Sequence, residues 1–174
     1  KTSEKVAFVG GFAKKPRFQG GGSSHINCFK ITNALEAVPA DAQVIYAEGF
    51  PADKDLYDEK LAAEAVQAAK AADKVVIFAG LPDSFESEGY DRSHMRLPEC
   101  QNRLIAEILE VQPNTVIVLH NGSPVEMPWI NNVKGILEAY LGGQAGGAAV
   151  ANILYGIVNP SGKLAETIPV KLAD

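Results

Sequence analysis

Residues 85–92, Phe-Glu-Ser-Glu-Gly-Tyr-Asp-Arg, hold the densest group of side chains that could do chemistry. Two carboxylic acids, Glu86 and Glu88, lie two positions apart in this segment. A carboxylic acid can protonate a leaving oxygen when burial or a nearby negative charge raises its pKa. From the residues alone, the segment is either an acid–base site or a solvated loop held by an interaction of the Asp91–Arg92 pair with the rest of the chain.

A glycine-rich run, Gln-Gly-Gly-Gly-Ser-Ser-His, occupies residues 19–25. Glycine allows positive φ and close approach of the backbone to a ligand. The run lacks the spacing of the phosphate-binding motifs G-x-x-x-x-G-K-[ST] and G-x-G-x-x-G, which disfavours a nucleotide site. Two interpretations remain: a flexible loop with Ser24 as a helix N-cap, or a loop that presents a serine hydroxyl to a neutral polar ligand.

Other chemical centres are disfavoured by spacing. Residues 120–126 contain His120 and Ser123, but the chain has no G-x-S-x-G segment that would present a nucleophilic serine. His25, His94 and His120 lack the paired spacing of zinc ligands. We therefore expect no metal ion and no cofactor.

Short apolar runs alternate with helix-like segments along the chain. Most of the runs are apolar at consecutive positions, which is typical of strands buried on both faces of a parallel sheet. Predicted strands cover residues 5–10, 43–47, 74–80, 115–120 and 133–140, with an edge strand at 163–169; predicted helices cover residues 26–38, 56–72, 98–111 and 145–155.

This alternation predicts a three-layer α/β/α sandwich with a mostly parallel sheet of about six strands, formed as a single domain by residues 1–174. Two long loops, at residues 11–25 and 81–97, each follow the carboxyl end of a predicted strand. Ligands of open α/β sheets bind outside those ends, and long loops in compact domains are usually functional. We therefore expect both loops at one rim.

Composition and charge exclude several kinds of partner. The 174 residues include 16 Lys and Arg against 21 Asp and Glu, a net charge of −5 at pH 7. An acidic surface is poorly suited to nucleic acid or anionic lipid, and no apolar run reaches the roughly 18 residues of a membrane span. The opening residues show no signal peptide, and Cys28 and Cys100 read as buried thiols. A cytoplasmic location is the resulting expectation.

Five segments, in the order GGGSSHIN, GLPDSFESEGYDRSHMRLP, HNGSPVEMPW, YLGGQAGG and NPSGKLAETIP, resemble glycoside hydrolase family 3. The resemblance covers nearly the whole chain and is to the α/β-sandwich domain of bacterial β-glucosidases. It implies a retaining β-glycosidase that removes terminal non-reducing β-D-glucosyl residues from glucosides or oligosaccharides. The active site would lie between this domain and a (β/α)₈-type barrel of the same polypeptide.

The resemblance also implies roles for individual residues. The nucleophilic aspartate belongs to the barrel and has no counterpart here. The general acid/base maps to Glu88, with Glu86 as its rival, because the family's loop reads Glu-Gly-Tyr. A sugar-binding serine maps to Ser23, with Ser24 as the less favoured neighbour. Three further residues are expected to support the acid/base loop: Tyr90, Asp91 and Arg92.

An isolated chain of this kind would hold half of an active site. We expect it to fold, to hydrolyse nothing, and to expose an apolar patch where the barrel docks, through which it could self-associate. The main alternative is a non-catalytic carbohydrate-binding or interaction module on the same fold. A second alternative is a flavodoxin-like nucleotide or flavin binder, since this architecture hosts many functions.

Overall fold

A five-stranded parallel sheet forms the centre of the computed structural model, which describes residues 3–174. The strand order is β2-β1-β3-β4-β5, and every neighbouring pair is parallel. The carboxyl ends of all the strands therefore lie at the same edge. The strands are β1 (Lys5–Val9), β2 (Gln43–Ala47), β3 (Lys74–Gly80), β4 (Thr115–His120) and β5 (Gly135–Glu138).

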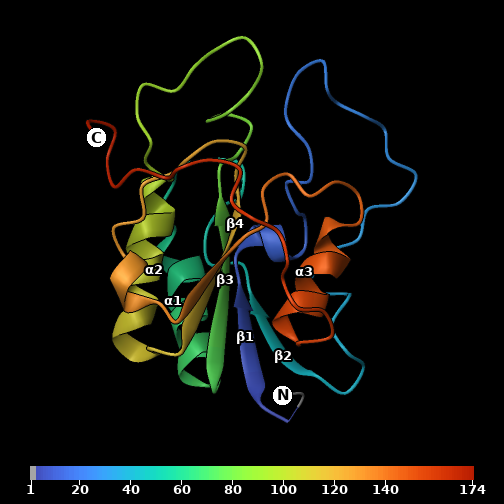
Figure 1. The fold of residues 1–174 in the computed structure, drawn as a ribbon. Coiled ribbons are helices and arrows are strands. Elements are labelled where there is room, and N and C mark those ends of the chain that lie inside the picture. Colours follow the sequence, from blue (N-terminus) through green and yellow to red (C-terminus); the bar gives the residue numbers. More distant parts are fainter. Residues whose placement is uncertain (1–2) are drawn as a thin grey trace.

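Helices cover both faces of the sheet, so the predicted three-layer sandwich is confirmed. α1 (Glu59–Lys70) and α2 (Glu99–Val111) pack on one face, and α3 (Gly146–Leu154) packs on the other (Figure 1). Two short 3₁₀ helices, η1 (Gly11–Ala13) and η2 (Ile130–Asn132), lie in the connections. Among residues 3–174, no helix has the length and apolarity needed to cross a bilayer.

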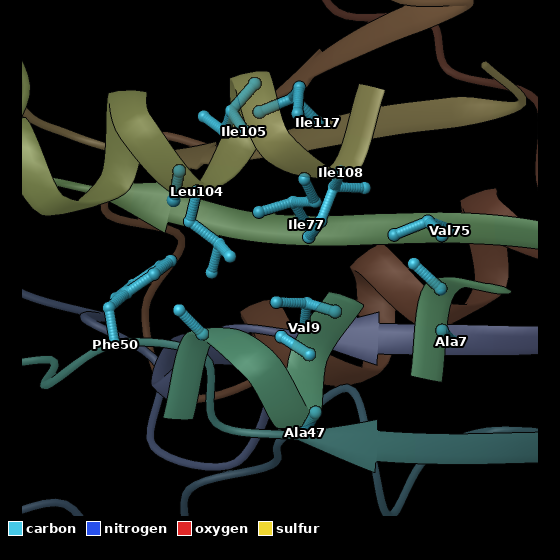
Figure 2. Packing of buried hydrophobic residues seen from close by; sticks show 14 of the residues in the cluster. Ala7, Val9, Ala47, Phe50, Val75, Ile77, Leu104, Ile105, Ile108 and Ile117 are labelled. Carbon is cyan, nitrogen blue, oxygen red and sulfur yellow. The ribbon is translucent and has the colours of Figure 1, made fainter. Parts of the chain in front are cut away.

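The larger core lies between the sheet and the α1–α2 layer. Buried alanines of α1 allow this helix to approach the sheet closely, while α2 contributes larger branched side chains (Figure 2). Their partners are the residues of β1, β3 and β4 that face this helical layer. Labelled members in Figure 2 include Val75, Ile77, Leu104, Ile105, Ile108 and Ile117.

Two predicted elements are wrong. Residues 163–169 do not form a strand, so the sheet has five strands rather than about six. Residues 26–38 form an irregular segment with one turn instead of a helix, and Ser24 is therefore not a helix N-cap. The apolar side chains that suggested a helical face, such as Ile26 and Phe29, point into solvent instead of a core.

Candidate active site

Two long loops meet at the carboxyl edge of the sheet. One follows β1 and carries the glycine-rich run; the other follows β3 and carries Glu86 and Glu88 (Figure 1). Because β1 and β3 are neighbours, their ends lie side by side. The backbone N–H of Ser23 in the first loop donates a hydrogen bond to the Glu88 carboxylate in the second. The predicted common rim is thus the actual arrangement.

Glu88 is exposed at this rim, with Ser23 as its hydrogen-bonding partner. Its neighbour Gly89 has a φ of 93°, a left-handed conformation that favours glycine. Hydrogen bonds from the side chain and backbone of Ser23 lower the pKa of Glu88 below its ordinary value. Glu88 is therefore a solvent-accessible carboxylate whose hydrogen-bonding partner among the described residues is Ser23.

Glu86 has very different surroundings. Its carboxylate accepts hydrogen bonds from the Arg17 guanidinium, from the Ser123 hydroxyl and, at 2.8 Å, from the backbone N–H of Gly122. Arg17 also donates from Nη2 to the Glu86 carbonyl at 2.8 Å and from Nε to Asp83 at 3.0 Å. The Arg17 side chain is 6% exposed and that of Glu86 is 19% exposed.

The hydrogen-bonding partners of Glu86 determine its protonation state. Burial by itself would raise the pKa, but hydrogen bonds from Ser123, Arg17 and Gly122 outweigh it, and the pKa of Glu86 lies below the ordinary value. Glu86 is consequently held ionised and has no free oxygen directed at the rim. The arrangement makes it an anchor for the loop, because it joins segments that follow β1, β3 and β4.

The predicted loop supports lie in three different environments. Arg92 donates from Nη2 to the Ser123 hydroxyl at 2.8 Å and to the Pro124 carbonyl at 2.9 Å. Tyr90 is exposed, and its hydroxyl donates to the Asp83 carbonyl at 2.6 Å. Asp91 is exposed and makes no hydrogen bond or ion pair within residues 3–174. Arg92 thus holds the loop to the turn that follows β4, whereas Asp91 forms no hydrogen bond or ion pair with any described residue.

Both candidate sugar-binding serines are exposed on the glycine-rich loop. The Ser24 hydroxyl donates a long 3.4 Å hydrogen bond to the Gly20 carbonyl within its own loop. Ser23 instead contacts Glu88 across the rim. Of the two, Ser23 is therefore the one that the structure brings to the acid/base candidate.

Gly22 allows the two loops to approach each other. Its φ is 90°, and a Cβ at this position would lie 2.5 Å from both Cβ and Oε2 of Glu88. We expect Gly22→Ala to displace Glu88 from Ser23 and to lower the free energy of unfolding by about 1–2 kcal/mol, because alanine is strained at this positive φ.

The matched control for Gly22→Ala is Gly162→Ala, whose Cβ would meet open space. Urea unfolding of this chain, and the glycosidase activity expected of the full-length polypeptide, would be compared for both variants. Full activity of the Gly22 variant would contradict the expected displacement.

The histidines do not assemble a site. His120 is buried beside Phe12 and Phe78, and burial lowers its pKa to about 4, so its imidazole is neutral. His25 is exposed on the glycine-rich loop, and His94 packs against Phe85. No group of His, Cys, Asp and Glu side chains within residues 3–174 could hold a metal ion.

Cys100 is buried as predicted, but Cys28 is only half-buried.

Sequence reasoning missed the roles of four polar residues beneath the rim, although Ser123 had been considered as a nucleophile. Arg17 and Ser123 hold Glu86, as described above. Asn121 is buried and donates from Nδ2 to the Ser123 carbonyl at 3.1 Å and to Glu138 Oε2 at 3.3 Å. Glu138 is the acidic end of an otherwise apolar strand. That interruption of the pattern was the one signal that could have identified it.

The glycine-rich loop continues into an exposed apolar segment. Ile26 is 66% exposed, Phe29 fully exposed and Ile31 43% exposed. Large exposed apolar side chains that gather on one segment often mark an interaction surface. We call these three residues the Phe29 segment.

A model of the glycosyl hydrolase family 3 C-terminal domain matches residues 1–174. The chain is 55% identical to thermostable β-glucosidase B of Acetivibrio thermocellus, over 99% of the chain and 23% of that protein. It is 45% identical to an exo-α-(1→6)-L-arabinopyranosidase of Bifidobacterium longum, again over 99% of the chain and 23% of that protein.

A solved structure, the family 3 β-glucosidase of Bifidobacterium adolescentis, is 46% identical and has a TM-score of 0.93. The match covers 99% of the chain and 26% of that protein. The chain therefore spans about a quarter of the length of the relatives it matches.

Proposed function

The chain belongs to glycosyl hydrolase family 3 as its C-terminal domain, and from that premise we propose that it supplies the general acid/base, Glu88, of a retaining β-glycosidase. The nucleophile would come from a barrel domain of the same polypeptide. The observation that carries the proposal is the contrast between the two carboxylates: Glu86 is enclosed by Arg17 and Ser123, whereas Glu88 is exposed at the rim.

The reaction would need both carboxyl groups in turn. An aspartate of the barrel attacks the anomeric carbon while Glu88, as the acid, protonates the glycosidic oxygen. Glu88, now a base, then takes a proton from water, which attacks the glycosyl-enzyme and releases the sugar with its original configuration. Retention requires the two carboxyl groups to be about 5–5.5 Å apart, so the rim must dock closely against the barrel.

The acid role requires a change in the surroundings of Glu88. In this chain its hydrogen bonds with Ser23 lower its pKa, so that it is ionised at neutral pH and has no proton to donate. Docking and substrate would exclude water, and a second carboxylate would lie nearby. Both effects raise the pKa of a carboxylic acid. We therefore expect Glu88 to become a competent acid only in the assembled site.

The proposed substrate is a glycoside with a terminal β-D-glucosyl residue. β-Glucosidase is the activity named for relatives of this chain, although an arabinopyranosidase is among them. We expect Ser23 to donate its hydroxyl to the sugar when substrate binds, and its exposure and its contact with Glu88 support this expectation. The choice among sugars would depend mainly on residues of the barrel.

The Phe29 segment would form part of the face that docks on the barrel. It follows the serines directly, and its three large side chains lie in solvent in this chain. Burying such side chains stabilises a contact by roughly 25 cal/mol per Å² of apolar surface. Without a docked barrel, the same segment could mediate self-association of the isolated chain.

An isolated chain should therefore fold but show no turnover of p-nitrophenyl β-glucoside, because it lacks the nucleophile. The full-length polypeptide, assayed in parallel, is the positive control. Turnover by the purified chain above the buffer rate would contradict a shared active site.

Chemical rescue tests the assignment of Glu88 directly. In the full-length enzyme, Glu88→Ala should form a glycosyl-enzyme from an activated aryl glucoside but release it slowly. Azide, which needs no general base, should accelerate release and give a β-glucosyl azide. Glu126→Ala, at a glutamate of the turn after β4, is the matched control. Absence of a β-configured azide product from the Glu88 variant would refute the role.

A further inference from the structure

Glu138 lies at the carboxyl end of β5, half-buried beneath the rim. Its Oε1 accepts a 3.1 Å hydrogen bond from the backbone N–H of Tyr140, and its Oε2 accepts a 3.3 Å bond from Asn121 Nδ2. Both donors are neutral, and the two bonds lower the pKa of Glu138 less than burial raises it. Within residues 3–174, Glu138 forms no ion pair with lysine or arginine.

The charges near Glu138 are unfavourable to a second negative charge. Glu86 and Glu166 both repel a charge on this carboxyl. Arg17 is already bound to Glu86, and His120, at the end of the neighbouring strand β4, is neutral. Burial is the largest cause that raises the pKa of Glu138, to about 7. These surroundings favour a neutral carboxyl, in contrast to those of Glu86.

A continuous set of hydrogen bonds joins Glu138 to the acid/base loop. Asn121 contacts both Glu138 and the Ser123 carbonyl, and the Ser123 hydroxyl donates to Glu86. The Ser123 hydroxyl also accepts from Arg92. Glu86 and Arg92 flank Glu88 in the same loop.

Asn121 has a feature that favours a proton on Glu138. Its Oδ1 is buried without a hydrogen-bond partner within the described residues. Buried polar atoms are usually paired. Since the same amide contacts Glu138, its Oδ1 is a candidate acceptor for the hydroxyl of a neutral Glu138. An ionised Glu138 offers no proton and leaves this oxygen unpaired.

We propose that Glu138 is a positioning residue whose neutral carboxyl fixes Asn121, and through Asn121 the Gly122–Ser123 turn that anchors the loop carrying Glu88. This inference rests on the proposed role of Glu88 for its catalytic meaning, but not for its structural content. Ionisation of Glu138 above neutral pH would loosen the turn and, with it, the Glu86 anchor.

Hydrogen exchange measured by mass spectrometry on the full-length enzyme tests the inference without relying on catalysis. The Gly122 amide donates to Glu86, so a peptide spanning residues 119–126 reports on the turn. Corrected for intrinsic exchange, its protection should fall about tenfold between pH 6 and pH 8.5. Glu138→Gln, which is permanently neutral and keeps the acceptor oxygen, should stay protected throughout. Glu64→Gln on α1, at an exposed position, should behave like the unaltered enzyme.

Activity supplies the second measurement. Glu138→Ala should lower kcat at all pH values, while Glu138→Gln should match the unaltered enzyme at pH 6 and exceed it at pH 8.5. Equal pH dependence of exchange in Glu138→Gln and the unaltered enzyme would overturn the inference. Failure of the Glu88 role would instead be seen in the azide experiment and would leave the exchange result intact.

Discussion

Glu88→Gln in the full-length enzyme should lower kcat/KM for glucosides with poor leaving groups, such as cellobiose, by about 10²–10⁴-fold. The loss should be far smaller with 2,4-dinitrophenyl β-glucoside, whose leaving group departs without a proton. The reason is that a glutamine at position 88 cannot donate a proton, although it keeps the size of the side chain. Steady-state kinetics on a series of aryl glucosides with graded leaving-group pKa would measure the dependence.

Glu86→Gln is the informative comparison, because it lies two residues away and removes a charge of the same sign. Arg17 would lose its buried partner, so this variant should lose stability and should lose activity equally on all substrates. Equal losses from Glu88→Gln on good and poor leaving groups would place the acid/base elsewhere. A leaving-group dependence that followed Glu86 instead would reverse the assignment.

Arg17→Met should cost about 3 kcal/mol of unfolding free energy at pH 7. Removing one member of a buried ion pair leaves the other charge unpaired and typically costs 3–5 kcal/mol. The lower end applies because the Glu86 side chain is 19% exposed and keeps its bonds from Gly122 and Ser123. Methionine fills a similar space without supplying charge, so the loss should reflect the ion pair more than packing.

The cost of Arg17→Met should depend on pH in a defined direction. The pKa of Glu86 is lowered in the folded chain, so its ionisation stabilises the fold above the unfolded pKa, and this stabilisation disappears as pH falls through the folded pKa. The difference between Arg17→Met and the unaltered chain should therefore be largest near pH 7 and shrink below about pH 4.

Urea unfolding of the chain at several pH values would measure that dependence. Arg103→Met serves as the control, because Arg103 is 54% exposed in its pair with Glu107. An exposed pair is worth at most about 1 kcal/mol. A cost for Arg17→Met no larger than that of Arg103→Met would contradict the role of Arg17 as an anchor.

Much of the fold could be predicted because each central strand can be recognised from its own run of apolar residues. Runs such as residues 74–80 are apolar at nearly every position, and only a sheet covered on both faces buries such a run. Residues 26–38 were wrongly predicted to form a helix, because their apolar pattern did not correspond to burial. The apolar residues of this segment are spaced as on a helix, yet Ile26 and Phe29 have no core to enter in this chain. Periodicity cannot tell a face that meets a core from one that meets solvent or a partner.

The sequence was sufficient to locate the candidate site in the loop of residues 85–92. It did not reveal which of the two glutamates is half-buried and which is accessible. Glu86 and Glu88 differ by two positions, and nothing local separates an anchored carboxylate from an accessible one. The difference is produced by Arg17, which is distant in the chain and reaches Glu86 only because β1 lies next to β3. Strand order was not predicted, so neither was this pairing. Glu138 and Asn121 were missed for the same reason, since their meeting depends on the pairing of β4 with β5.

The close contact between Gly22 and Glu88 constrains how this protein can evolve. A mutation that reshaped the glycine-rich loop to admit a different sugar would also move the backbone N–H that Glu88 holds. Under the proposed roles of Ser23 and Glu88, a change in sugar preference on this loop would therefore also alter the surroundings of the acid/base. New preferences should arise more readily by changes on the opposing domain, which leave that contact untouched.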